Sequence, residues 1–221
     1  MTRWRWAALA AVATILTGLS FGLVPASDAC RAVAAHPWAE FQQVATPHAA
    51  TTLIDACGAG RLRSGMWIDA LAFIPVYAAF LLASLWAARP QHLVGLAMVA
   101  LLSVGVFADQ IEGFRLLAMI DANGGTTAMV AAANRATFAK ELFLAAATGA
   151  VGLAVFGMRD WRRYAGALVV AGAAIVVVAL FTHRPTAPVM LVLWLTLAVV
   201  ALTGALRSEV PADRNGAISP R

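Results

Sequence analysis

The chain has 221 residues, of which 62% are hydrophobic and only 12% are charged. A soluble domain carries about 25% charged residues, and one as apolar as this would expose a large hydrophobic surface and aggregate. The composition therefore excludes an ordinary soluble protein and indicates a polytopic membrane protein. The net charge of +5 does not point to nucleic acid as a partner, because most arginines stand beside apolar segments, where they orient membrane helices.

Six segments are long and apolar enough to be transmembrane helices, which need about 20 residues each. They are residues 6–24, 67–87, 93–120, 137–158, 164–182 and 187–206. Their apolar residues are continuous and do not alternate with polar ones, which favours helices over a β-barrel. The predicted fold is an all-α transmembrane bundle of about six spans, with a five-helix bundle over residues 66–206.

The arginines predict the orientation of these spans. If the N-terminus is cytoplasmic, nine of the sixteen basic residues lie on the cytoplasmic side: Arg3, Arg5, Arg89, Arg159, Arg162, Arg163, Arg207, Arg214 and Arg221. Six spans then place both termini in the cytoplasm, including a polar tail, residues 207–221, that we expect to be disordered. The Ala- and Arg-rich, Lys-poor composition is typical of bacteria, so the expected location is the bacterial plasma membrane.

The first span, within residues 1–25, has a second interpretation. The basic start TRWRW, an apolar run and the small residues of PASDAC resemble a cleaved secretory signal. The apolar run of residues 6–24 exceeds the 7–15 residues of an ordinary signal core, which favours a retained transmembrane helix.

Residues 26–65 form the one sizeable loop, and the orientation places it outside the cytoplasm. Its apolar residues predict a short amphipathic helix lying on the membrane surface: Phe41, Val44, Leu53, Ile54 and Cys57. Cys30 and Cys57 flank the loop on the oxidising side, so they either form a disulfide or remain two small apolar residues. His36 and His48 lack a third ligand nearby, and we therefore predict no metal site.

The most specific feature is a set of charged residues at one depth. Counting along the spans from their cytoplasmic ends at about 1.5 Å per residue places five charges just under the outer surface: Asp69, Asp109, Glu112, Lys140 and Glu141. Arg115 is predicted just above them. Charges within a membrane are costly, so we expect these side chains to face inward and to form a ligand- or proton-binding cluster.

Helical spacing predicts contacts within this set. The turn DANGGT, residues 121–126, should join two spans into a hairpin that brings Asp109 opposite Lys140. Glu112 and Arg115 are three residues apart on one helix and are candidates for an ion pair.

On the second span, an acid and two aromatic residues share one helical face: Asp69, Phe73 and Tyr77. Pro75 lies beside them. In a regular α-helix it leaves the carbonyl of Leu71 without a donor and favours a kink. A kink beside polar and aromatic groups predicts a cavity.

The acids of the cluster outnumber the bases. Four carboxyl groups (Asp69, Asp109, Glu112 and Glu141) face two cationic groups (Arg115 and Lys140). Some acid is therefore protonated, hydrated or paired with a ligand. The alternative is structural: the charge pairs only lock the helices together, as polar contacts in membranes do at about 0.6 kcal/mol each.

The segments WIDALAFIPVYAAF, FADQIEGFR and RATFAKELF carry a resemblance over about residues 40–145. The chain resembles an uncharacterised family of small bacterial polytopic membrane proteins with a D-x-x-x-F-x-x-x-Y helix followed by an A-D-x-x-E helix. The matching residues are Asp69, Phe73, Tyr77, Asp109, Glu112 and Lys140. Asn often follows the D-x-x-E in that family, and here Gly113 stands in its place. The resemblance implies no activity.

Three functions remain open. In the first, the cluster binds or moves a small solute, an ion or a lipid headgroup, with proton exchange on Asp109 or Glu112. In the second, Asp69 or Glu112 is the general base of an enzyme acting on lipid at the outer interface. In the third, the protein is an assembly partner. The nucleophile elbow, zincin and phosphate-loop motifs do not occur, and no histidine lies inside a span, so an enzyme is not favoured and no cofactor is predicted. The bilayer is the one partner that the sequence identifies.

Overall fold

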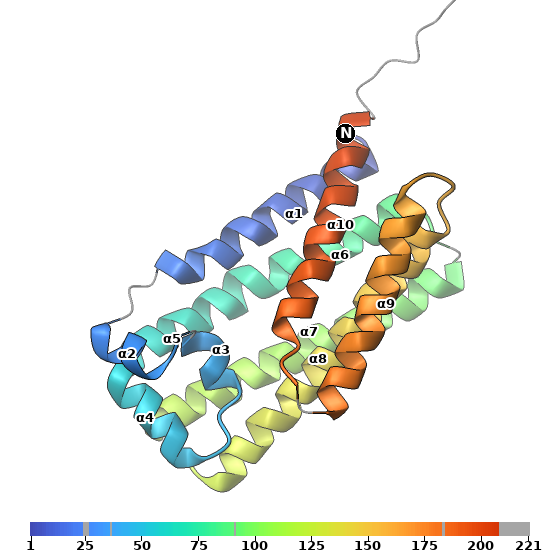
Figure 1. The fold of residues 1–221 in the computed structure, drawn as a ribbon. Helices are drawn as coiled ribbons and strands as arrows, with labels where there is room; N and C mark the ends of the chain where they lie inside the picture. The colour runs from blue at the N-terminus through green and yellow to red at the C-terminus, as the bar shows by residue number, and fades with distance from the viewer. Residues whose placement is uncertain (24–26, 36, 91, 183, 208–221) are drawn as a thin grey trace, which may run out of the picture.

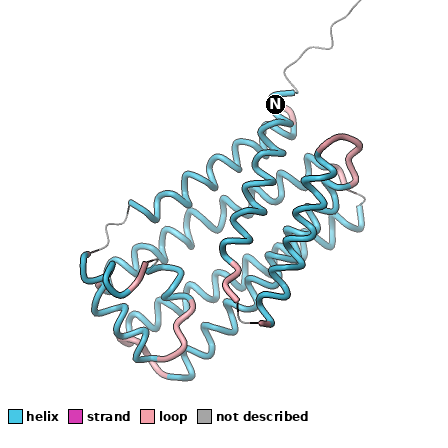
Figure 2. Tube along the Cα trace, in the orientation of Figure 1, coloured by secondary structure: helices cyan, strands magenta, loops and turns pink. Residues whose placement is uncertain are grey.

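The computed structural model describes residues 1–23, 27–35, 37–90, 92–182 and 184–207. Over these residues the chain folds into α-helices joined by short turns and contains no strand, as the all-α prediction requires (Figure 2). The predictions about His36 and about the tail beyond Arg207 fall outside the described residues.

Five helices of the described chain are long and apolar enough to cross a membrane: Ala59–Ala88, α7 (His92–Asp121), α8 (Thr127–Phe156), α9 (Arg162–Phe181) and α10 (Ala187–Arg207). The first of these combines α5 (Ala59–Ile68), a π-helical segment (Asp69–Phe73) and α6 (Ile74–Ala88). The protein is therefore a polytopic membrane protein with a helical bundle, as predicted.

The prediction of six spans differs from the structure at the N-terminus. The helix there, α1 (Arg3–Ser20), is not among the five apolar helices, because Arg3 and Arg5 lie in its first turn and the α-helix ends at Ser20. A 3-10 turn, Phe21–Leu23, follows it. The helix nevertheless belongs to the bundle, since it packs along α6 and α10 (Figure 1).

The hairpin of α7 and α8 is the longest paired element of the bundle. Its turn needs three consecutive residues with positive φ: Asn123 at 47°, Gly124 at 100° and Gly125 at 70°. Glycine adopts these angles without steric cost, and asparagine is among the few other residues that tolerate them. The DANGGT sequence thus ends α7 and starts α8 within a few residues and so fixes the register between the two helices.

A cap made of α2 (Asp28–Val33), α3 (Pro37–Gln42) and α4 (Pro47–Cys57) covers the end of this hairpin. Apolar residues of the cap share one buried cluster with residues of α5, α7 and α8: Cys30, Phe41, Leu53, Ile54, Leu62, Met66, Leu116, Met119, Ile120 and Val130. The amphipathic segment expected on the membrane surface therefore turns its apolar face toward protein.

Polar contacts fix the cap in place. A disulfide joins Cys30 to Cys57. Thr51 Oγ1 donates to the carbonyl of Asn123 at 2.8 Å, which ties α4 to the tip of the hairpin. Asn134 of α8 donates to the carbonyl of Val44 at 3.2 Å. The loop is thus a small packed unit held to α8 and to the hairpin turn.

The two ends of the bundle differ in what they carry. The start of α1, the end of α10 and the α6–α7 and α8–α9 turns lie at one end, and the cap, the hairpin tip and the α9–α10 turn lie at the other (Figure 1). We call the first the arginine-rich end, because it holds Arg3, Arg5, Arg89, Arg159, Arg162, Arg163 and Arg207.

The disulfide should contribute measurably to stability. Cys30 and Cys57 are separated by 27 residues, and closing a loop of that length lowers the entropy of the unfolded chain by an amount worth about 3.5 kcal/mol. We expect Cys30→Ser, Cys57→Ser and the double variant to lose similar stability when the purified protein is unfolded by denaturant. A double variant clearly less stable than either single variant would contradict this, because both singles already lack the bond.

Candidate functional site

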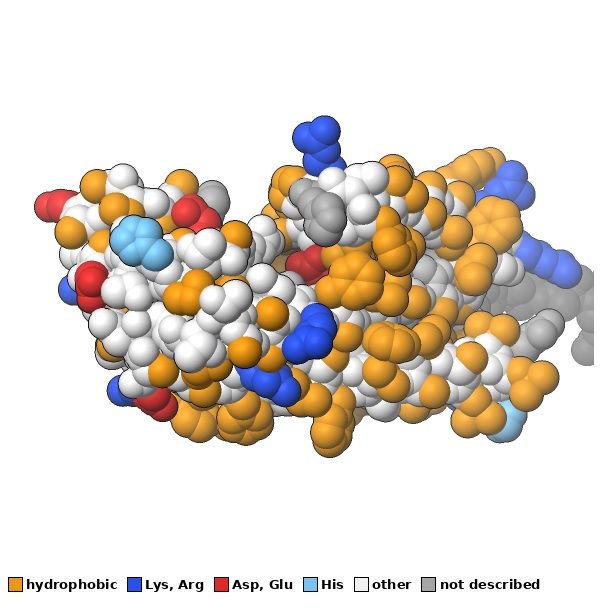
Figure 3. All heavy atoms as spheres, turned by 90° about the horizontal axis from the view of Figure 1, so that it is seen from below, with side chains coloured by type: hydrophobic (Ala, Val, Ile, Leu, Met, Phe, Trp, Pro, Cys, Tyr) orange, Lys and Arg blue, Asp and Glu red, His pale blue; other side chains and the backbone are white. Residues whose placement is uncertain are grey.

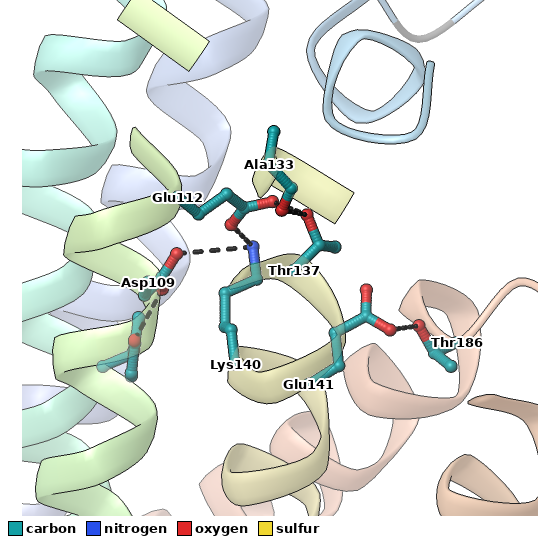
Figure 4. Close-up of polar contacts among 8 residues, drawn as sticks. Asp109, Glu112, Ala133, Thr137, Lys140, Glu141 and Thr186 are labelled. Carbon is teal, nitrogen blue, oxygen red and sulfur yellow. Dashed lines mark hydrogen bonds and ion pairs between the residues drawn. The ribbon is translucent and has the colours of Figure 1, made fainter. Parts of the chain in front are cut away.

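The α7–α8 hairpin brings two buried acids to one buried lysine (Figure 4). Lys140 Nζ lies 3.3 Å from Asp109 Oδ1 and contacts Glu112 Oε2. Asp109 is 4% exposed, Glu112 1%, and the Lys140 side chain 11%. The predicted pairing of Asp109 with Lys140 across the hairpin is confirmed, and Glu112 joins it because Asp109 and Glu112 share a helical face.

Each acid has one oxygen held by a hydroxyl group and the other paired with the Lys140 ammonium. Tyr77 Oη donates to Asp109 Oδ2 at 2.7 Å. Thr137 Oγ1 lies 2.5 Å from Glu112 Oε1 and 3.2 Å from the carbonyl of Ala133, and we assign its single hydrogen to the charged acceptor. Asp109 Oδ1 and Glu112 Oε2 are fully buried, and among the described residues the Lys140 ammonium is what compensates them.

A third carboxylate lies nearby on the π-helical segment. Asp69 is its first residue, is 9% exposed, and interacts electrostatically with Asp109, Glu112 and Lys140. Its carboxylate accepts no hydrogen bond from any side chain within the described residues. Asp69 therefore adds a negative charge to the cluster and brings no cation with it.

Pro75 explains part of the unusual backbone around Asp69. In this segment the N–H of Ile74 bonds to the carbonyl of Asp69, five residues back. In that register the carbonyl of Ala70 points to position 75, which has no N–H. Gln110 Nε2 of α7 donates to it instead at 3.0 Å. A wide turn of this kind is a feature frequent at functional sites. The expectation that Pro75 frees the Leu71 carbonyl stays a prediction.

Aromatic rings line the cluster on the side of α6 and α10. The Tyr77 ring lies 5.1 Å from Trp194 and 5.5 Å from Phe73, and Phe73 lies 5.7 Å from Phe21. Trp194 Nε1 donates to Thr148 Oγ1 at 3.2 Å, which holds the indole in this position. Phe73 and Tyr77 share a face, as their spacing predicted, and Trp194 completes the wall from the last helix.

Two residues expected in the cluster lie outside it. Arg115 is exposed and forms no ion pair with Glu112, because the Glu112 carboxylate is turned toward Lys140 on the neighbouring helix. Glu141 follows Lys140 by one position, about 100° around α8, and accepts a hydrogen bond from Thr186 at 2.7 Å (Figure 4).

Several residues that hold the cluster or its surroundings in place were not predicted from the sequence. Thr137 could have been found, because it lies three positions before Lys140 and so shares its helical face. Gln110, Trp194 and Thr186 carry no such signal. Their partners lie 40 or more positions away in the chain, and a single sequence does not show which distant helices meet.

The charges at the centre of the cluster do not balance. Asp69, Asp109 and Glu112 sum to −3 and Lys140 adds +1, so the formal charge is −2. A buried excess of this kind is expensive unless a proton or another cation compensates it. Among the described residues no three His, Cys, Asp or Glu side chains are arranged to hold a metal ion.

Comparison of the chain with protein-family models, with curated proteins and with solved structures gave no match.

Removing the lysine should strongly destabilise the protein. Lys140→Met leaves Asp109 and Glu112 buried without their cation, and breaking a buried pair in this way costs about 3–5 kcal/mol. Adding Glu112→Gln to Lys140→Met should recover part of the loss in the free energy of unfolding. Arg115→Met is the matched control, and a similar loss in that exposed variant would contradict the assignment.

Tyr77→Phe should leave Asp109 Oδ2 without its donor. Losing one partner of a buried hydrogen bond costs about 1–3 kcal/mol. Thermal unfolding of the purified protein measures this, with Tyr164→Phe, a change in an exposed tyrosine, as the control. Equal melting temperatures for the wild type and Tyr77→Phe would show that the hydroxyl does not hold the carboxylate.

Proposed function

We propose that this protein binds a small cationic solute in the cluster of Asp69, Asp109, Glu112 and Lys140, and exchanges it for protons. We further propose that it lies in the bacterial plasma membrane with six crossings and cytoplasmic termini, α1 being the first crossing beside α6 and α10. The observation that carries the function is the contact of two buried carboxylates, Asp109 and Glu112, with the single Lys140 ammonium group, beside a third buried acid, Asp69, that interacts with them electrostatically.

The formal charge of −2 supports the cationic solute. This negative charge favours cations over anions, since an anionic solute or headgroup entering the cluster would add to the excess of negative charge. It also explains why protons and solute would compete, because either one neutralises the same carboxylates. A cluster used only to lock helices together gains nothing from a third acid, since each added buried charge carries its own desolvation cost.

The aromatic wall supports an organic cation in particular. The faces of Trp and Tyr rings attract ammonium groups through their quadrupoles, by about 2 kcal/mol or more where water is excluded. Tyr77 and Trp194 lie together beside the acids. A positively charged nitrogen near Asp109 would therefore meet both opposite charge and aromatic surface.

The shape of the surface supports entry from the capped end. The Lys140 side chain keeps 11% of its surface exposed, so the cluster is not sealed. The face seen from below in Figure 3 is hollowed between the cap and the rest of the bundle, and acidic atoms are visible in that hollow. Apolar side chains cover much of the remaining helical surface in the same view, as contact with lipid requires.

The arginine-rich end supports the proposed orientation. Short loops rich in arginine remain in the cytoplasm, and the α6–α7 and α8–α9 turns share this end with the start of α1 and the end of α10 (Figure 1). The cluster then opens to the outside. The resemblance to the D-x-x-x-F-x-x-x-Y and A-D-x-x-E family remains a proposal and adds no activity to this one.

The test is proton release on solute binding. Purified protein in weakly buffered detergent solution, with a pH-sensitive dye, is titrated with tetramethylammonium, methylammonium, sodium and potassium chlorides. We expect at least one cation to release protons from the wild type, and Asp109→Asn and Glu112→Gln to abolish the signal while still melting cooperatively.

Glu141→Gln is the matched control. It removes the same charge one residue from Lys140, but from a side chain bonded to Thr186 outside the cluster. We expect it to keep the proton release of the wild type. The proposal fails if the wild type releases no proton with any of the cations, or if Glu141→Gln loses proton release as fully as Asp109→Asn and Glu112→Gln do. Either result would leave the cluster a purely structural role.

A further inference from the structure

A groove lies at the arginine-rich end, far from the acidic cluster. It is lined by residues from the start of α1, the end of α6 and the start of α7, and it has a volume of about 640 Å³. That volume falls within the range of about 300–1,000 Å³ found for small-molecule sites.

The polar part of the groove is cationic. Arg3, Arg89 and His92 line it, and none of the lining residues in the described chain is an acid. Arg3 lies 4.8 Å from the centre of the Trp86 ring and 3.4 Å from the carbonyl of that residue, so its guanidinium is held toward the groove. Neither Arg3 nor Arg89 forms an ion pair within the described residues. The groove thus presents two cations whose charge no residue in the described part of the chain neutralises.

The remaining wall is apolar and continues away from the polar end. It includes Leu82 and Trp86 on α6 and Leu96 and Val99 on α7. These side chains are between 40% and 55% exposed, so the described residues leave about half of each uncovered. From His92 to Val99 the wall runs about 10 Å along α7, at 1.5 Å per residue. Cationic groups at the membrane edge with an apolar channel below them match a phosphate headgroup followed by acyl chains.

We propose that this groove binds an anionic phospholipid, with the headgroup phosphate between Arg3 and Arg89 and an acyl chain along Leu82, Leu96 and Val99. Basic pockets between transmembrane helices on the cytoplasmic side bind anionic headgroups in this manner. The site shares no residue with the acidic cluster and does not depend on the function proposed for it.

Native mass spectrometry of the detergent-purified protein tests the site. Phosphatidylglycerol and phosphatidylcholine with identical acyl chains are added in turn. Inorganic phosphate is added in a separate experiment, which tests whether the groove binds a free anion instead of a lipid. We expect phosphatidylglycerol to bind at least tenfold more tightly than phosphatidylcholine. Arg3→Gln with Arg89→Gln should weaken phosphatidylglycerol binding about thirty-fold, since each arginine contributes roughly fivefold.

Arg159→Gln is the matched control, because it removes an exposed arginine at the same end but outside the groove. It should change the affinity by less than about twofold. Arg89→Gln alone is the second variant, because in the part of the chain that the structure describes the Arg89 side chain has no ion pair whose loss would unfold the protein. Equal binding of the two lipids, equal losses in Arg159→Gln and Arg89→Gln, or full displacement of the lipid by millimolar phosphate would each overturn the proposal.

Discussion

The ion pairs between Lys140 and the two acids of α7 are the interaction on which the arrangement of the bundle depends. An isolated charge costs about 2.5–3.5 kcal/mol at the middle of a bilayer and less near its surface, so packing that brings the charges of α7 and α8 together is favoured. Asp109 and Glu112 reach Lys140 because the turn after Asp121 joins the helices without a long loop. A shift of one residue along either helix would turn one partner toward lipid.

Other features near the cluster are arranged around these acids. Asp109 is held by Tyr77, and the Tyr77 ring is held in turn by Trp194 and Phe73. The wide turn at Asp69–Phe73 leaves the Ala70 carbonyl to Gln110, so the same change of backbone that places Asp69 also joins this helix to α7. Polar contacts therefore connect α6, α7 and α8 through one centre, and the Trp194 ring adds α10 to it. The third acid leaves that centre short of positive charge.

The two ends of the molecule differ in the groups that they carry. The capped end holds the acids, and its covering loop is fixed by a disulfide and by hydrogen bonds to the hairpin and α8. The arginine-rich end holds exposed cations and a groove with apolar walls. A solute entering from one side and a lipid bound at the other would therefore contact opposite ends of α7, and neither would need to displace the other.

The sequence by itself determined the class of protein and the core of the cluster. Apolar segments long enough to cross the membrane specify helices, because lipid offers no hydrogen-bond partner for backbone N–H and C=O groups. The spacing about the DANGGT turn specified that Asp109 faces Lys140, since the two residues lie at similar distances from that turn along their own helices. The first segment is a helix as the sequence predicts, but Arg3 and Arg5 lie in its first turn and keep it from being among the five most apolar helices, so its crossing of the membrane stays a prediction.

Tertiary structure alone decided the remaining contacts. Glu112 can reach Arg115 on its own helix or Lys140 on the next, and helical spacing allows both, but only the packing of α7 on α8 selects Lys140. Packing likewise turned Glu141 toward Thr186 and brought Trp194 to Tyr77. A helix fixes the direction of each side chain about its own axis, whereas the neighbour that the side chain meets depends on how separate helices pack together.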